Sequence, residues 1–441
     1  MGNYEKLEGS SLVRITDELP RKEHRNCSLR ILVCWSVLLS FLLCLCLGFI
    51  SLGLVGLQSG EVHKVEQRLV CYYASDGTHN LSLLDVPGDL CTHINIGPAT
   101  LDNATIVLPD TLRKVLQNDS RSFRAAHPQV RLLLWIGGAD SGRQYAVMGT
   151  LIIVRWTPYH HAMRKVFLRS LREILRTYPS LDGIDLDWEF PSAYDRERMH
   201  LSQLLYEIRT EWRREKRTND ILSLAVAAPE GIAIYAYDIR ELNLYADYVN
   251  LMSYDFHFYR EDTPFTGLNA PLYARSQERS LMATFNINYT VQWWLKSGLE
   301  PQRLVVGLPT YGHSFTLVNP LNHRIGAPAS GYGKCGQLGF TTLTETCECA
   351  SKFFKPNLSY DAESCSPYLS ALQEWISYEN QKSIACKANY VKSLNLGGVM
   401  VFSLNADDLR NSCSFMPNLK YSEKPVFPLT QAIKDILRES L

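Results

Sequence analysis

Leu181-Asp182-Gly183-Ile184-Asp185-Leu186-Asp187-Trp188-Glu189-Phe190-Pro191 is the stretch that decides the fold of this chain. Successive side chains of a β-strand point to opposite faces, so Asp185, Asp187 and Glu189 share one face. The residues between them are large and apolar, and Pro191 ends the run. A strand with a solvated acidic face is the alternative, but the large apolar residues between the acids argue against it. The stretch therefore predicts a strand whose acids do not simply face solvent.

Eight short apolar runs predict eight strands. They alternate with stretches of helical periodicity, such as 167–178 and 201–214. Strands separated by helices predict an α/β fold, and eight such units predict a (β/α)8 TIM barrel, whose functional groups lie at the carboxyl ends of the strands. The expected strands are Leu69–Tyr73, Thr92–Gly97, Val130–Ile136, Gly183–Trp188, Leu222–Ala227, Tyr248–Ser253, Leu304–Leu308 and Gly398–Phe402.

The gap between the seventh and eighth runs is about ninety residues, which is too long for a bare loop. It contains cysteines, glycines and aromatic residues. We therefore expect a small inserted subdomain at about 315–390 that walls one side of the cleft, within a catalytic domain that spans 69–441.

The charge balance argues against one class of function. The chain carries 45 basic and 45 acidic residues, so its formal net charge is zero. A nucleic-acid-binding domain typically carries a basic excess. No nucleic-acid partner is therefore expected.

The acidic row on the central strand indicates chemistry. Carboxylates this close repel one another unless protons or hydrogen bonds intervene. Neighbouring carboxylates raise the pKa of the last group and keep it protonated near its working pH. The row at Asp185, Asp187 and Glu189 is therefore suited to acid catalysis.

Residues 31–57 form an uninterrupted stretch without a charged side chain. At about 1.5 Å per residue, a helix of this length spans a bilayer core of roughly 30 Å. A cleaved signal peptide is the alternative, but its apolar core usually has only about 7–15 residues. Basic residues cluster at 21–30, so the positive-inside rule places the 1–30 tail in the cytoplasm and the part after a stem at 58–68 outside. The sequence predicts a single-pass type II membrane protein with an extracellular or lumenal catalytic domain.

The cysteines and the glycosylation sequons agree with export. Of the twelve cysteines, eight follow the predicted anchor, and an even set in an exported domain predicts disulfides. Buried thiols are the alternative, and the pairing stays open because eight cysteines can pair in many ways. Sequons occur at Asn80, Asn103, Asn118, Asn288 and Asn357, all on the predicted outer side.

The spacing Asp182-x-x-Asp185-x-Asp187-x-Glu189 resembles the signature of glycoside hydrolase family 18, the chitinases and their lectin-like relatives. The resemblance runs from about Leu69 to Pro428 and is similar to the animal chitinases with an inserted α+β subdomain. Further motifs in the family's order are Cys71-Tyr72-Tyr73, Ile136-Gly137-Gly138, Met252-Ser253-Tyr254-Asp255, Gly307-Leu308-Pro309-Thr310-Tyr311-Gly312-His313 and Gly397-Gly398-Val399-Met400.

The resemblance implies hydrolysis of β-1,4-linked N-acetylglucosamine oligomers by a substrate-assisted, retaining mechanism. Glu189 would protonate the glycosidic oxygen, while the substrate's own acetamido oxygen attacks the anomeric carbon. Asp187 would orient that acetamide, Asp185 would share a proton deeper in the barrel, and Tyr254 would donate to the acetamido carbonyl. The partner would be a glycan, and no metal or other cofactor is implied. The substrate-binding residues that it implies are Tyr72, Met252, Asp255, Tyr311, His313 and Phe402.

The chain departs from the family pattern at its aromatic platforms. Asp76 and Ala139 stand where aromatic residues are usual, Phe402 replaces a tryptophan, and Asn405 replaces an aspartate. Smaller aromatic surfaces weaken the binding of a long polymer more than they impair proton donation by the acid, so little activity on crystalline chitin is expected. His313 replaces an arginine and is either a source of pH dependence or a surface residue.

Two functions of different classes stay open. Inactive relatives lose the terminal acid of the signature, so Glu189 favours a hydrolase. The missing platforms favour a membrane-anchored lectin that binds the same glycans with little or no turnover.

The topology prediction has a direct test in membranes from cells that express the chain. The protein should stay in the pellet after alkaline carbonate extraction, because a spanning helix is not released by a change in charge. Removal of N-glycans should increase its electrophoretic mobility. A carbonate-soluble chain without glycans would contradict the predicted anchor.

Overall fold

The computed structural model of the chain describes residue 35 and residues 67–76, 81–139, 141, 144, 159–192, 196–413 and 426–439. Within this part of the chain, no helix is long and apolar enough to cross a membrane. The predicted tail, the anchor apart from Trp35 and most of the stem lie outside the described residues. The fold below belongs to the compact unit Val65–Leu441.

The barrel closes because its first strand pairs with its last. β1 (Arg68–Ala74) pairs in parallel with β15 (Gly398–Phe402) on one side and with β2 (His93–Asp102) on the other. Eight parallel strands therefore form a ring, which confirms the predicted barrel, and each expected run becomes one strand. The short strand β3 (Thr105–Val107) folds back on the end of β2. The ring continues from β2 through β4 (Arg131–Gly138), β5 (Gly183–Trp188), β6 (Ile221–Ala227), β7 (Tyr248–Met252) and β8 (Leu304–Pro309).

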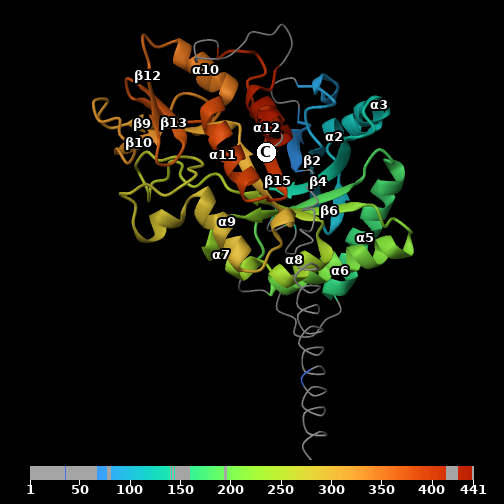
Figure 1. The fold of residues 1–441 in the computed structure, drawn as a ribbon. Coiled ribbons are helices and arrows are strands. Elements are labelled where there is room, and N and C mark those ends of the chain that lie inside the picture. The colour runs from blue at the N-terminus through green and yellow to red at the C-terminus, as the bar shows by residue number, and fades with distance from the viewer. Residues whose placement is uncertain are drawn as a thin grey trace, which may run out of the picture. The chain divides into compact units, whose positions relative to one another are not determined.

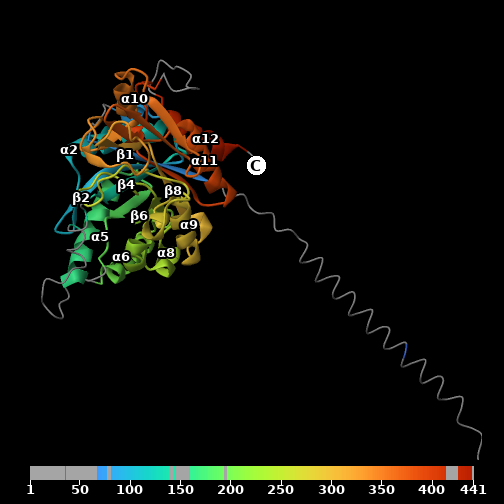
Figure 2. The same ribbon diagram turned by 90° about the vertical axis from the view of Figure 1, so that its left-hand side faces the viewer.

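Helices cover the outside of the barrel, and α5, α6, α8 and α9 follow one another around it (Figures 1 and 2). In α5 (Tyr159–Thr177), Phe167, Leu171 and Leu175 recur at helical spacing and are buried. The amphipathic pattern predicted for this stretch is therefore confirmed. The other barrel helices are α2 (Asp110–Lys114), α3 (Ser120–Ala126), α6 (Glu197–Arg214), α7 (Glu230–Ala236), α8 (Ile239–Tyr245), α9 (Ile287–Lys296), α11 (Gln381–Ser393) and α12 (Pro428–Arg438).

A second, antiparallel sheet is inserted between β8 and α11, and its strands gather beside the barrel in Figure 1. It spans 311–377, whereas the sequence suggests about 315–390, because the end of that range forms α11 of the barrel. The sheet buries a core of its own, with Phe315 and Trp375 fully buried. The elements are β9 (Tyr311–Leu317), β10 (Ala329–Tyr332), β11 (Phe340–Thr342), α10 (Leu343–Ser351), β12 (Asn357–Asp361), β13 (Ser366–Ala371) and β14 (Glu374–Ser377).

Four disulfides confirm the prediction that the eight cysteines after the anchor are oxidised. Two of them join the inserted subdomain to the barrel. Cys365–Cys386 connects the loop before β13 to α11, and Cys347–Cys413 connects α10 to the segment after β15. The pairs are Cys71–Cys91, Cys335–Cys349, Cys347–Cys413 and Cys365–Cys386.

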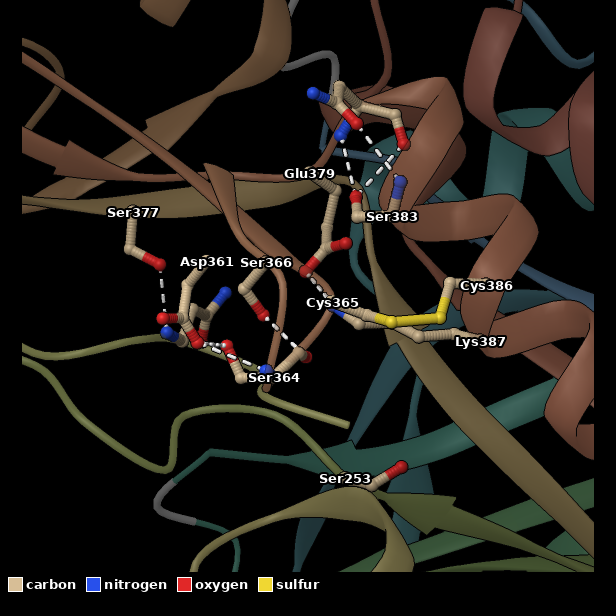
Figure 3. Close-up of polar contacts among 12 residues, drawn as sticks. Ser253, Asp361, Ser364, Cys365, Ser366, Ser377, Glu379, Ser383, Cys386 and Lys387 are labelled. Carbon is tan, nitrogen blue, oxygen red and sulfur yellow. Dashed lines mark hydrogen bonds and ion pairs between the residues drawn. A yellow bond between two sulfur atoms is a disulfide. The ribbon is translucent and has the colours of Figure 1, made fainter. Parts of the chain in front are cut away.

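A buried ion pair lies beside one of these cross-links, at the junction between the inserted sheet and α11 (Figure 3). The Lys387 ammonium donates to the Glu379 carboxylate, and the two side chains are 0% and 2% exposed. Burial lowers the pKa of Lys387 and raises the pKa of Glu379, and the attraction between the two charges opposes both shifts. Each group therefore depends on the other to stay charged at this junction.

The substitution Lys387→Met tests this dependence. It leaves the Glu379 carboxyl buried without its partner, and breaking a buried pair in this way costs about 3–5 kcal/mol. Thermal unfolding should show a large drop in the midpoint for Lys387→Met. The double variant with Glu379→Leu should regain much of the loss. Lys296→Met, on an exposed position of α9, is the matched control. A wild-type midpoint for Lys387→Met would contradict the prediction.

Candidate active site

A cleft of about 810 Å³ opens at the carboxyl ends of the barrel strands. Of the ten residues that the sequence analysis selects, nine line it, and Asp185 lies beneath the others. Met252, at the end of β7, is one of the nine and is half-buried. The structure therefore brings together residues from strands that lie far apart in the sequence.

Asp185 forms the floor of the site and is fully buried. Its carboxylate accepts hydrogen bonds from the Tyr72 hydroxyl at 2.5 Å, the Ser223 hydroxyl at 2.6 Å and the Asn250 amide at 2.9 Å. Burial raises the pKa of Asp185, and these three hydrogen bonds act against the rise. Donors from β1, β6 and β7 thus hold one acid in a fixed orientation inside the ring.

Asp187 lies two residues further along β5 and is 2% exposed. The Trp135 indole donates to its Oδ2 at 2.8 Å, and its Oδ1 has no hydrogen-bond partner among the described residues. Burial raises the pKa of Asp187 well above its usual value, and the charges of Glu189 and Asp185 add to the rise. The site thus favours the neutral carboxyl and leaves one of its oxygens without a hydrogen-bond partner among the described residues.

Glu189 ends the acidic row, lines the cleft and is half-buried. The Ser141 hydroxyl fixes the backbone here, because it donates to the Asp187 carbonyl at 2.9 Å and accepts from the Glu189 amide at 3.1 Å. Of the three acids, Glu189 is the most accessible to a bound molecule.

One wall of the cleft is built around the Asp255 carboxylate. The Tyr311 hydroxyl donates to Oδ1 at 2.6 Å, and the His313 Nε2 lies 2.7 Å from the same oxygen. His313 is 9% exposed, so it belongs to this wall rather than to the surface. The two rings hold the carboxylate in place at the edge of the cleft.

Aromatic rings form the base of the cleft. The Phe402 ring centre lies 5.4 Å from that of Tyr72, 5.7 Å from that of Tyr254 and 5.8 Å from that of Trp135. Within the described part of the chain, the only hydrogen-bond partner of the Tyr254 hydroxyl is the Met400 sulfur, a weak acceptor that lies 4.0 Å away. Burial, followed by the charges of nearby carboxylates, raises the pKa of Tyr254 well above its usual value. The hydroxyl therefore stays protonated and can donate to a ligand.

Sequence reasoning missed the residues that hold the acids. Ser223 and Asn250 are polar residues inside apolar strand runs, and this interruption is the signal that identifies them. Trp135 lies opposite Asp185 in the pairing of β4 with β5. The hydrogen bond from its indole to Asp187 depends on this strand register, which cannot be inferred from the sequence.

The fourth acid of the motif lies away from the cleft. Asp182 precedes β5 and accepts from the Leu132 amide at 2.8 Å and from the Arg131 guanidinium at 3.0 Å. It therefore joins β5 to β4 at the opposite end of the strand.

Two of the departures from the family pattern are also visible. Ala139 is exposed at the cleft and offers no ring. Asn405 exchanges two hydrogen bonds with the backbone of Ala74, at 2.8 Å and 3.0 Å, and so helps to fix the end of β1.

Replacing Asp187 should change how stability depends on pH. Its pKa is raised in the folded state, so the folded chain binds more protons than the unfolded chain above the ordinary aspartate pKa, about 3.9. This contribution to stability is present at low pH and is lost as pH rises through the folded pKa. Asp187→Asn cannot ionise, so its thermal midpoint should exceed that of the wild type by a few degrees at pH 7, on the scale of about 2–4 °C per kcal/mol.

The gain in the thermal midpoint should disappear near pH 4. The control Asp102→Asn, which replaces an exposed carboxyl, should show no such change with pH. If the thermal midpoints of Asp187→Asn and the wild type differ by the same amount from pH 4 to pH 7, burial does not disfavour the charge of the Asp187 carboxylate.

Comparisons with known proteins agree with this geometry. The family model described as "Glycosyl hydrolases family 18" matches residues 68–407. Human chitinase-3-like protein 2 is 30% identical over 393 residues, which covers 86% of this chain and 93% of that protein. Mouse chitotriosidase-1 is 30% identical over 363 residues, which covers 78% of this chain and 74% of that protein.

Solved structures give the same result. A structure described as "Human YKL-39 is a pseudo-chitinase with retained chitooligosaccharide binding properties" matches with a TM-score of 0.75 at 28% identity, and covers 85% of this chain and 100% of that one. The Group IV chitinase of Ostrinia furnacalis matches with a TM-score of 0.74 at 27% identity, with the same coverage. The closed barrel, the row of acids on its fourth strand and the family model over 68–407 lead to one conclusion: this chain belongs to glycosyl hydrolase family 18.

Proposed function

We propose that the chain hydrolyses β-1,4-linked N-acetylglucosamine oligomers, with Glu189 as the acid and the substrate's acetamido group as the nucleophile. The observation that carries this proposal is the graded burial of the three acids, two of them on β5 and Glu189 directly after it. The two inner carboxyls are almost fully buried, and only the outer one is half-open to the cleft. This arrangement provides one accessible proton donor and no second carboxylate at the surface of β5 to act as nucleophile.

The proton comes from the outer pair of acids. The charge of Glu189 is one cause of the raised pKa of Asp187, so ionising both carboxyls at once is costly. The pair therefore retains a proton to a higher pH than an isolated carboxyl would. In the first step, that proton passes from Glu189 to the glycosidic oxygen as the bond to the anomeric carbon breaks.

The nucleophile is supplied by the substrate. The Asp187 Oδ1 offers an acceptor, and the protonated Tyr254 hydroxyl offers a donor. An acetamido group has one N–H and one carbonyl, so it complements this pair. Its carbonyl oxygen attacks the anomeric carbon as the bond to the protonated leaving oxygen breaks, and an oxazolinium ion forms. Because the proton of the Asp187–Glu189 pair has left through Glu189, Asp187 is ionised at this point, and its negative charge stabilises the cation. Water activated by Glu189 then opens the ring, and the product keeps the β configuration.

Sugar rings need an apolar surface as well. Phe402 provides it at the base of the cleft, supported by the rings around it. Because Phe402 has a smaller ring than tryptophan and Ala139 has none, we propose short oligomers rather than crystalline chitin as substrates.

The second candidate is a glycan-binding protein with little turnover. It is favoured by the small number of aromatic platforms and by the resemblance to human YKL-39, described as a pseudo-chitinase that retains chitooligosaccharide binding. The half-open Glu189 favours the enzyme. We also propose that the 31–57 stretch anchors the chain as a type II membrane protein, which places the cleft outside the cell or in a lumen.

Glu189→Gln distinguishes the two functions. The amide cannot donate a proton to the leaving oxygen, and general acid catalysis contributes roughly 10²–10⁴-fold, so turnover of a fluorogenic chitobioside should fall by about that factor. Affinity for chito-oligosaccharides, measured by calorimetry, should change little. The matched control is Glu173→Gln, at an exposed position of α5, which should keep wild-type turnover.

Proton NMR of freshly released product reads its anomer before mutarotation. A first-formed β anomer is expected, and an α anomer would overturn the substrate-assisted mechanism. A wild-type chain that binds chitobiose without any turnover would support the lectin instead.

A further inference from the structure

The cleft contains a cationic side chain that the proposed reaction does not use. Among the described residues that line the cleft, Arg260 is the only arginine or lysine. It lies in the loop that follows β7, and its side chain is 58% exposed. N-acetylglucosamine oligomers are neutral, so their cleavage gives this charge no role.

The orientation of the Arg260 guanidinium is fixed on one side. Its Nε and Nη2 each donate to the Asp262 carboxylate at 2.9 Å. A guanidinium has five N–H donors, and this pairing uses two of them. The other three, on Nη1 and Nη2, make no further hydrogen bond within the described chain. They form a second edge whose geometry matches the two oxygens of a carboxylate or sulfate group.

The loop that carries Arg260 is attached to the inserted sheet. The Thr263 amide donates to the Arg260 carbonyl at 3.1 Å and closes a tight turn. The Thr266 amide then donates to the Ala327 carbonyl at 2.8 Å. Tyr259 packs against the core of the inserted sheet. Because the backbone is held in this way, little ordering is needed when a ligand binds.

Exposed rings accompany the charge on the same wall. Phe258 is 37% exposed, and its ring centre lies 5.5 Å from that of His313. Phe340 is 38% exposed and stacks on Tyr311 at 4.6 Å. These rings provide apolar faces for sugar rings beside the His313 and Tyr311 rings that contact Asp255, in the cleft that Arg260 lines.

The rest of the cleft disfavours an anion. Its other acidic groups are Asp187, which the site holds neutral, and the carboxyls of Glu189 and Asp255. His313 already pairs with Asp255. An acidic substituent is therefore disfavoured by the acids and finds a matching cationic partner at Arg260. Such an arrangement fixes the register of a charged glycan as well as its affinity.

We propose that this wall is a subsite for an N-acetylhexosamine oligosaccharide that carries a carboxylate or sulfate group, bound through the open edge of Arg260. The inference rests on the proposed function and narrows its substrate class. The natural substrate is thus an acidic glycan rather than neutral chitin alone.

Calorimetry with the full chain carrying Glu189→Gln tests the proposal without turnover. Three probes are compared: chitotetraose, its 6-O-sulfated form and its 6-O-carboxymethyl form. At least one acidic probe should bind roughly five- to tenfold more tightly than the neutral one, as expected for a charge-assisted pair at a partly exposed site. Adding Arg260→Gln should abolish this preference and change the neutral affinity by less than about twofold. Arg260→Lys should keep part of the preference for the acidic probe. The lysine ammonium retains the positive charge but lacks the parallel N–H donors of the guanidinium.

Arg303→Gln is the matched control, since Arg303 pairs with Glu300 outside the cleft, and it should leave the preference intact. A preference for sulfate alone or carboxylate alone identifies the group and supports the subsite. Equal weakening of all three probes by Arg260→Gln, or no preference before that change, overturns it. If chitotetraose binds and neither acidic probe binds more tightly, only the subsite is refuted. If none of the three probes binds, the proposed function is refuted as well.

Discussion

Three carboxyl groups follow one another along β5 and the residue after it, and the two inner ones must be accommodated inside the ring without bulk water. The structure meets this constraint differently at each depth. Asp185 receives three donors, Asp187 receives one donor and keeps an unfilled oxygen, and Glu189 reaches the cleft. The number of protein partners thus falls toward the mouth of the barrel, where a ligand takes their place. The buried acids cost stability in the absence of ligand, as is common where charge is held ready for a reaction.

The neighbours of the acids are constrained in turn. A Cβ on Gly138 would lie 3.3 Å from the Trp135 ring and 3.7 Å from the Asp187 Oδ2, and the backbone there has φ +111°. The positive φ favours glycine here, and a side chain would also crowd the indole. Gly138 therefore leaves the space in which the Trp135 ring reaches Asp187.

Short apolar runs between helical stretches predicted the ring of strands well, because the strands of a barrel covered by helices are buried along almost their whole length. The row of acids followed from the alternation of side chains along a strand, since Asp185, Asp187 and Glu189 are neighbours along one chain segment. Residues whose roles arise from pairing between strands were harder to predict. Ser223 and Asn250 meet Asp185 only when β6 and β7 pair beside β5, and Tyr72 of β1 meets it only once the ring has closed. No local pattern specifies these contacts between strands. Arg260 was missed for a related reason: loop residues have no period, and its place in the cleft is set by backbone bonds to a distant insertion.

The pairing of β1 with β15 also constrains the order in which the chain can fold as it is made. Roughly 320 residues separate the two strands, and at about 5–20 residues per second the ribosome needs on the order of half a minute to deliver the second after the first. During that time one side of β1 has no strand beside it, and an unpaired strand edge invites aggregation. Cys71–Cys91 joins β1 to the segment just before β2, and the two cysteines are only 20 positions apart in the sequence. In an oxidising compartment this cross-link can form while most of the chain is still unmade. It would hold the first two strands together until the last one arrives.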